Sequence, residues 1–296
     1  MAFWRSFAGL IAMTVIFIIA GKFTLVKGQR FSPAIFFSGL FLGLLSSLYV
    51  ISTQYTTLAN ASFLIYTGPV YSTILATVFL KESFRLSMLG SLGAVIIGTL
   101  LIVGIISENG IGLNLDPQYT IGNLIALASG VAYGLYLFVS RLRTDFDSNV
   151  RAWYNFLFAA GTIAIMVMIR WSDLEYPIRE WNGNTPGGII DSKPWILSEM
   201  GTRSWIFLII TAVITGFGAF YFLTLATKIL FAGELATISY QETIMASLLG
   251  FVLFSETLTP LQLLGGALIV GGGVSQIFMS VKNAGAEPKM SEVNSE

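Results

Sequence analysis

The chain contains Tyr66-Thr67-Gly68-Pro69, followed by an apolar run that ends in Leu80-Lys81-Glu82-Ser83-Phe84-Arg85. A second copy, Tyr240-Gln241-Glu242-Thr243, is followed by an apolar run that ends in Phe254-Ser255-Glu256-Thr257-Leu258-Thr259. The two tyrosines (66 and 240) and the two terminal glutamates (82 and 256) are each separated by 174 residues. Each copy lies between long apolar stretches. The pattern therefore indicates a duplicated bundle of membrane helices, an architecture common among secondary transporters.

Composition supports lipid as the solvent for most of the chain. Hydrophobic residues make up 55% and charged residues 11% of the 296 residues, whereas a soluble domain carries about 25% charged residues. The net charge is zero and no basic stripe occurs, so we expect no nucleic-acid partner. Cysteine and histidine are both absent, which removes disulfides, thiol nucleophiles and the usual zinc ligands. We therefore expect no enzyme, no metal site and no cofactor.

Nine apolar segments are long enough to cross a bilayer, which takes about 20 helical residues. The sequence thus predicts an all-α membrane protein with nine transmembrane helices in two inverted repeats, four in the first and five in the second. The first repeat covers 1–110 and the second covers 121–281, with an extracytoplasmic loop at 171–203 and a disordered tail at 282–296. The expected spans are 4–21, 34–54, 59–80, 86–106, 121–141, 152–170, 204–225, 230–254 and 258–280.

The distribution of lysine and arginine predicts the orientation. Eleven of the 16 basic residues lie in loops on one side or in the tail, and the other five, Arg5 among them, lie on the opposite side. Because basic residues accumulate in cytoplasmic loops, the N-terminus should lie outside and the C-terminus in the cytoplasm. We expect a multi-pass protein of the plasma membrane.

The ordered duplication resembles the drug/metabolite transporter superfamily, EamA type, over nearly the whole chain except 171–203 and the tail. The family's pattern has an acid and a proline inside the fourth helix of a repeat, then a glutamate at the helix end. Glu242-Thr243 matches the acid without the proline, and Gly68-Pro69 matches the proline without the acid. Glu256 and the glycine-rich stretch from Gly265 to Gly273 match the last part of the pattern. The resemblance implies ten helices in two inverted five-helix repeats.

The first repeat departs from that family pattern. Segment 4–21 corresponds to 152–170 of the second repeat, so the counterpart of 121–141 would lie before Met1. Two expectations follow: either this protein lacks the family's usual first helix, or its chain begins further upstream.

Glu242 is the acid that the sequence places deepest within a span. A carboxylate at mid-bilayer is costly, so it should face a cavity or a partner. One interpretation is a proton-coupling or substrate-amine site. The other is a structural acid hydrogen-bonded to Ser239 or to a neighbouring helix.

Further candidates for a substrate site are aromatic, amide or helix-breaking residues. Tyr66 and Tyr240 occupy equivalent depths and suit an organic substrate, although packing tyrosines fit the pattern equally well. Pro69 breaks a backbone hydrogen bond, and such breaks either line transport sites or serve as packing kinks. Asn155 and Gln54 are cavity candidates because an amide facing lipid is costly. Glu82 and Glu256, at span ends, are interpreted as loop-anchoring charges, with gating ion pairs as the alternative.

The function these observations favour is secondary active transport of a small organic metabolite, amino-acid-like or related, by alternating access. The resemblance implies export rather than uptake. Membrane lipid and a small-molecule substrate are the expected partners, and proton coupling through Glu242 is a hypothesis. The competing classes are a non-transporting membrane scaffold and an intramembrane enzyme, for which the chain offers no convergent nucleophile and base.

Overall fold

Each predicted span corresponds to at least part of a helix in the computed structural model of the chain. The residues that the structure describes are 2–21, 23–27, 32–79, 86–103, 106–107, 110–111, 117–142, 147–171, 201–219, 222, 242, 245–256 and 258–284. Of the remainder, Ser239, Tyr240, Glu82 and most of the 171–203 loop lie outside the described residues.

The described residues of the first half form six helices and one short strand pair. The helices are α1 (Ala2–Ile19), α2 (Phe23–Lys27), α3 (Pro33–Ser52), α4 (Leu58–Ile65), α5 (Gly68–Phe79) and α6 (Leu86–Val103). Strands β1 (Ile106–Ser107) and β2 (Gly110–Ile111) form a two-residue antiparallel ladder. The predicted span 59–80 is therefore two helices, interrupted at Tyr66 and Thr67.

The second half continues with long helices. They are α7 (Pro117–Arg141), α8 (Ser148–Trp171) and α13 (Pro260–Ala284). Shorter helices are α10 (Thr202–Thr211), which continues directly into the π-helix η2 (Ala212–Gly218), and a separate helix at Met245–Phe254. Helix α13 extends three residues into the predicted tail, whose remainder lies outside the described residues.

Four helical stretches are long and apolar enough to cross a membrane by themselves. They are Ala2–Ile19, Pro33–Ser52, Tyr119–Ser140 and Asn149–Met168, and shorter apolar helices accompany them among the described residues. The all-α membrane class is confirmed. The number of nine spans stays a prediction.

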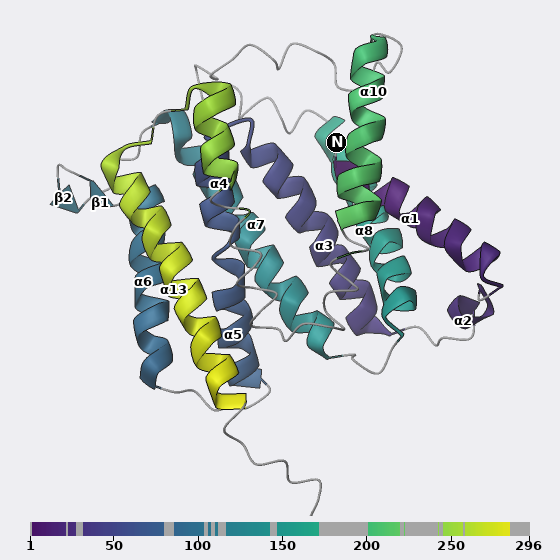
Figure 1. Ribbon diagram of the computed structural model, residues 1–296, viewed down its shortest axis with the longest axis horizontal. Helices are drawn as coiled ribbons and strands as arrows, with labels where there is room; N and C mark the ends of the chain where they lie inside the picture. Colours follow the sequence, from purple (N-terminus) through teal and green to yellow (C-terminus); the bar gives the residue numbers. More distant parts are fainter. Residues whose placement is uncertain are drawn as a thin grey trace, which may run out of the picture.

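The helices of the two halves interleave (Figure 1). Helix α13 packs along α6, and α3 packs between α7 and α8. Helix α1 packs against α8 and η2. One hydrophobic cluster joins residues of α4, α5 and α6 to α7 and α13, and a second joins α1, α2 and α3 to α8. Each cluster thus draws on both halves, so the two halves share their hydrophobic cores.

Two pairs of sequence-equivalent helices run antiparallel. Helix α6 begins at Leu86 and α13 begins at Pro260, again 174 residues apart. A Cβ atom built on Gly98 would meet Gly265 and Ile269, and one built on Gly265 would meet Ile102, so the chains run in opposite directions. In α1 and α8, Gly9 faces Phe156, while Thr14 accepts a hydrogen bond from Trp153 Nε1 at 2.8 Å. That register is antiparallel too.

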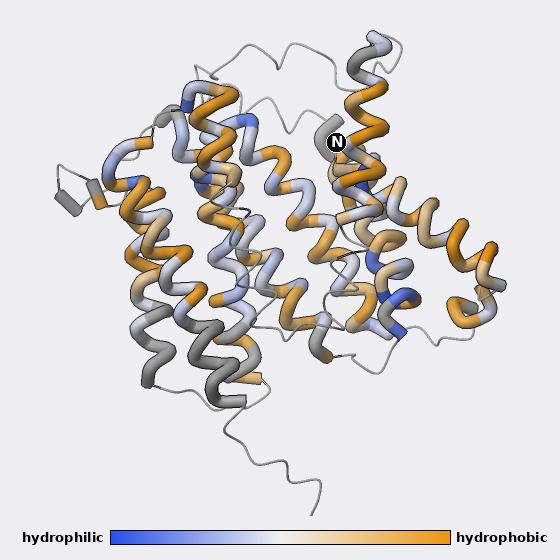
Figure 2. The backbone as a smooth tube through the Cα atoms, in the orientation of Figure 1, coloured by the Kyte–Doolittle hydropathy of each residue, from blue (hydrophilic) through white to orange (hydrophobic). Residues whose placement is uncertain are grey.

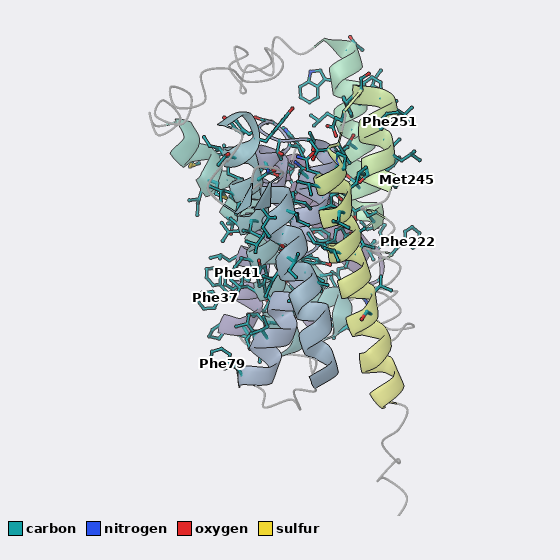
Figure 3. The ribbon with its side chains drawn as sticks, turned by 90° about the vertical axis from the view of Figure 1, so that its left-hand side faces the viewer. Phe37, Phe41, Phe79, Phe222, Met245 and Phe251 are labelled. Carbon is teal, nitrogen blue, oxygen red and sulfur yellow. The ribbon has the colours of Figure 1, made fainter. Side chains whose placement is uncertain are left out.

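Large apolar side chains cover the outside of the bundle. Phe37 and Phe79 are exposed on one side, and Phe222, Met245 and Phe251 on the opposite side (Figure 3). Hydrophobic residues follow most helices along their length (Figure 2). A soluble monomer rarely exposes so much contiguous apolar surface, so these faces are the ones that contact lipid.

Candidate functional site

A hydrogen bond joins Tyr66 to Glu242, two of the residues predicted to form the site. The Tyr66 hydroxyl donates to Glu242 Oε2 at 2.6 Å, across 176 residues of sequence. Tyr66 is buried, whereas Glu242 is exposed. The carboxylate is thus held by a fixed phenol but is not enclosed by packed side chains.

The interruption between α4 and α5 positions Tyr66. Helix α4 ends at Ile65, and α5 restarts at Gly68 with Pro69 as its second residue, where a proline needs no backbone donor. The Thr67 hydroxyl donates to the carbonyl of Leu64 at 2.7 Å and so satisfies a carbonyl at the break. Pro69 therefore marks a real break, as predicted, and the break carries Tyr66.

Helix α7 supports this break through small residues. A Cβ atom on Gly130 would lie 2.5 Å from the Leu64 carbonyl oxygen, and one on Gly134 would lie 2.7 Å from the Gly68 carbonyl oxygen. Only glycine lets the backbones approach so closely. From the same helix, the ring of Tyr133 packs edge-on to that of Tyr66, with centroids 6.2 Å apart and planes at 90°. The phenol of Tyr66 is thereby given one orientation.

Arg5 and Tyr49 also lie within electrostatic reach of Glu242. Arg5 belongs to α1, and its backbone is in direct contact with Gly216 of the π-helix η2. A Cβ atom at Gly216 would come within 2.9 Å of Arg5 Cα, so the glycine fixes how near α1 approaches η2. The site thus gathers a guanidinium, a carboxylate and three phenols, from Arg5, Glu242, Tyr49, Tyr66 and Tyr133.

A second polar group lies at the N-terminus of α4. Glu256 Oε1 accepts from the backbone N–H of Leu58 at 2.8 Å, and Oε2 accepts from that of Ala59 at 3.5 Å. Nearby, the Thr56 hydroxyl donates to Asn123 Oδ1 at 2.6 Å. The prediction that Glu256 anchors a loop at a span end is confirmed, and its partner is a helix N-terminus in the other half of the chain.

The comparisons with known proteins agree with this architecture. The model of the EamA-like transporter family matches residues 1–104 and 120–275. This chain belongs to the EamA-like transporter family. A relative from Archaeoglobus fulgidus, called an uncharacterized transporter, is 24% identical over 225 residues, which cover 76% of this chain and 68% of the relative. A crystal structure of a protein 17% identical, with a TM-score of 0.58, covers 95% of this chain and 88% of that one, and it shares the fold.

The remaining predicted site residues of this EamA-like transporter are not brought to Glu242 by any described contact. Asn155 is buried in α8 against Gly39 of α3, and its Oδ1 has no hydrogen-bond partner among the described residues. Gln54 is exposed in the turn that follows α3. Ser239 and Tyr240 lie outside the described residues, so their part in the site stays a prediction.

Three residues of the site were not predicted from the sequence. Arg5 was counted only among the basic residues of the outer side, although the predicted span 4–21 contains it; it lies in α1, within electrostatic reach of Glu242. Tyr49 and Tyr133 lie toward the ends of predicted spans, where aromatic residues commonly form an interfacial belt. Their location inside the helices α3 and α7 was the signal that could have identified them.

Proposed function

We propose that this protein is a secondary active transporter that exports a small organic metabolite, amino-acid-like or related, across the plasma membrane by alternating access. The observation that carries the proposal is the hydrogen bond from Tyr66 to Glu242, at the break between α4 and α5. An intramembrane carboxylate is functional by default, and broken helices line the sites of many transporters. Members of the EamA-like family are transporters and generally not enzymes.

The charges of the site suit a solute with polar ends and an apolar body. Glu242 would accept an ammonium group, Arg5 would donate to an anionic group, and the tyrosines would pack against the apolar part. Ser239 and Tyr240 are proposed as further contacts from the segment that precedes Glu242. Export rather than uptake follows from the family resemblance.

We infer alternating access between two inverted halves, an arrangement found in many carriers, and the antiparallel pairs α6–α13 and α1–α8 support it. A two-fold axis along the membrane normal would make equivalent helices parallel instead. The proposed topology has the N-terminus outside and the C-terminus in the cytoplasm. Because the chain has no cysteine, a membrane-impermeant maleimide tests this: Q54C should react in intact cells, and a reaction only after lysis would reverse the orientation.

A ligand screen by thermal unfolding tests the site. The detergent-solubilised protein is heated with amino acids, nucleosides or sugar phosphates, and a ligand at 100 times its Kd adds about 2.7 kcal/mol of stability. We expect one class to raise the Tm of the parent protein and to lose that effect in E242Q and Y66F. Y154F is the matched control, because it removes a tyrosine hydroxyl that donates to the Val26 carbonyl away from Glu242.

The outcome separates a carrier from a scaffold. Stabilisation that survives in E242Q and Y66F would place the binding site elsewhere. A protein that no solute stabilises, and whose Tm is indifferent to E242Q, would behave as a scaffold.

A further inference from the structure

The segment from Glu242 to Glu256 is fastened to α4 at both ends of that helix. Glu242 accepts from the Tyr66 hydroxyl, directly after the last residue of α4, and Glu256 accepts from Leu58 and Ala59 at its first turn. The helix Met245–Phe254 therefore runs antiparallel to α4 and beside it (Figure 1). Two carboxylates from one half of the chain hold a short helix of the other half.

Glu256 completes the hydrogen bonding of the α4 N-terminus. The first four N–H groups of a helix have no partner within it. Here Glu256 binds those of Leu58 and Ala59, the Thr57 hydroxyl accepts from Asn60 at 3.1 Å, and the Thr57 carbonyl accepts from Ala61 at 3.0 Å. A carboxylate at this position also interacts favourably with the helix dipole. Removal of Glu256 leaves two amides without these bonds.

The backbone conformation of the turn before Glu256 positions its carboxylate. Ser255 adopts a positive φ of 53°, and the backbone N–H of Glu256 donates to the Gly250 carbonyl at 3.1 Å. The carboxylate lies directly over Gly250, where a Cβ atom would collide with Oε2. A positive φ is uncommon for a residue other than glycine. At Ser255 it turns the chain so that the next side chain, Glu256, contacts the first turn of α4.

We propose that Glu256 is the latch that closes this end of the bundle above the Tyr66–Glu242 site. α4 spans about 12 Å from Leu58 to Ile65 at 1.5 Å per residue, so the latch and the site lie at its opposite ends. Opening this end requires Glu256 to release the Leu58 and Ala59 amides. The inference rests on the proposed function, since alternating access is what requires such an opening.

Ser62 is a suitable position for a cysteine whose reactivity reports whether the latch is open. It lies four residues after Leu58 and four before Tyr66, on the stripe of α4 between the two fastened ends. Its side chain is 1% exposed. S62C introduces a single cysteine into a chain that has none, so the rate of maleimide modification reports how often the packing around α4 opens.

The experiment compares the rate of S62C modification in the parent and in E256A, both purified in detergent. Loss of two charge-assisted hydrogen bonds should raise the rate about tenfold or more. E256Q keeps the side-chain length and one acceptor oxygen, so it should raise the rate by less, about threefold. Should E256A fail to fold, E256Q carries the test.

Two controls distinguish the loss of a local latch from a destabilisation of the whole helix bundle. Gln262, in the first turn of α13, accepts from the Thr259 N–H at 3.0 Å and makes no hydrogen bond to α4 within the described part of the chain, so Q262A should leave the rate unchanged. S38C reports from the first turns of α3, at the opposite end, and should not become more reactive in E256A. The proposal is overturned if folded E256A and E256Q react like the parent, or if S38C accelerates equally. The assay needs no substrate, so its result is independent of the transport measurements. The latch can be disproved while the transport proposal stands, and the transport proposal can be disproved while the latch stands.

Discussion

At the scale of single residues, the candidate site depends on the hydrogen bond that Tyr66 donates to Glu242 at 2.6 Å. Glu242 and Tyr66 were each predicted as site residues from their type and depth in an apolar segment. Their hydrogen bond depends on how two positions 176 residues apart in the sequence are oriented toward each other. Side chains at equal depth can face opposite directions, and one sequence does not determine those orientations.

A double-mutant cycle measures the contact between Tyr66 and Glu242. Hydrogen bonds to charged groups contribute about 1.5–3 kcal/mol, and the exposure of Glu242 lowers that value. We therefore expect Y66F and E242Q to show a coupling of about 1–2 kcal/mol in the free energy of unfolding, measured by denaturant titration in detergent. Y154F combined with E242Q should be additive. Additive effects for Y66F and E242Q would mean that the hydrogen bond does not form in solution.

At the scale of elements, helix positions were predictable because lipid leaves few alternatives. A chain in a bilayer must satisfy its backbone internally, so each long apolar segment becomes a helix. The break after Ile65 was predictable from Pro69. The support of that break by Gly130 and Gly134 of α7 was not, because a glycine has no side chain to show which neighbour it faces. The π-helix at Ala212–Gly218 had no sequence signal.

Two glycines of α6 test whether α6 and α13 pack as described. A Cβ atom on Gly98 would lie 2.5 Å from the backbone oxygen of Gly265, which cannot move aside, whereas nothing lies within 4 Å of one on Gly93. G98A should therefore lower the free energy of unfolding by about 1–3 kcal/mol.

G93A is the matched control on the same helix. It should be neutral or stabilising by about 0.5–1 kcal/mol, because alanine loses less conformational freedom than glycine in a helix. Equal effects of G98A and G93A on denaturant unfolding would contradict the close crossing of α6 and α13.

At the scale of the whole molecule, the duplicated motif and the order of the apolar segments predicted which helices are equivalent, and the packing determines how they combine. The equivalent helices α6 and α13 are in contact, as are α1 and α8, and both hydrophobic clusters contain residues of both halves. The sequence predicted two repeats but could not predict that they share their cores. Polar contacts also join the two halves, among them those that Glu242 makes with Tyr66 and Glu256 makes with the first turn of α4.

The most direct test of the central claim is transport in proteoliposomes. The metabolite class that stabilises the parent protein is followed across the membrane, with and without a pH gradient, for the parent, Y154F and E242Q. The account predicts transport by the parent and by Y154F, and a rate in E242Q below about a tenth of the parent's, as expected for loss of one charged contact. Transport by E242Q at the parent's rate and with the parent's response to the pH gradient would contradict it.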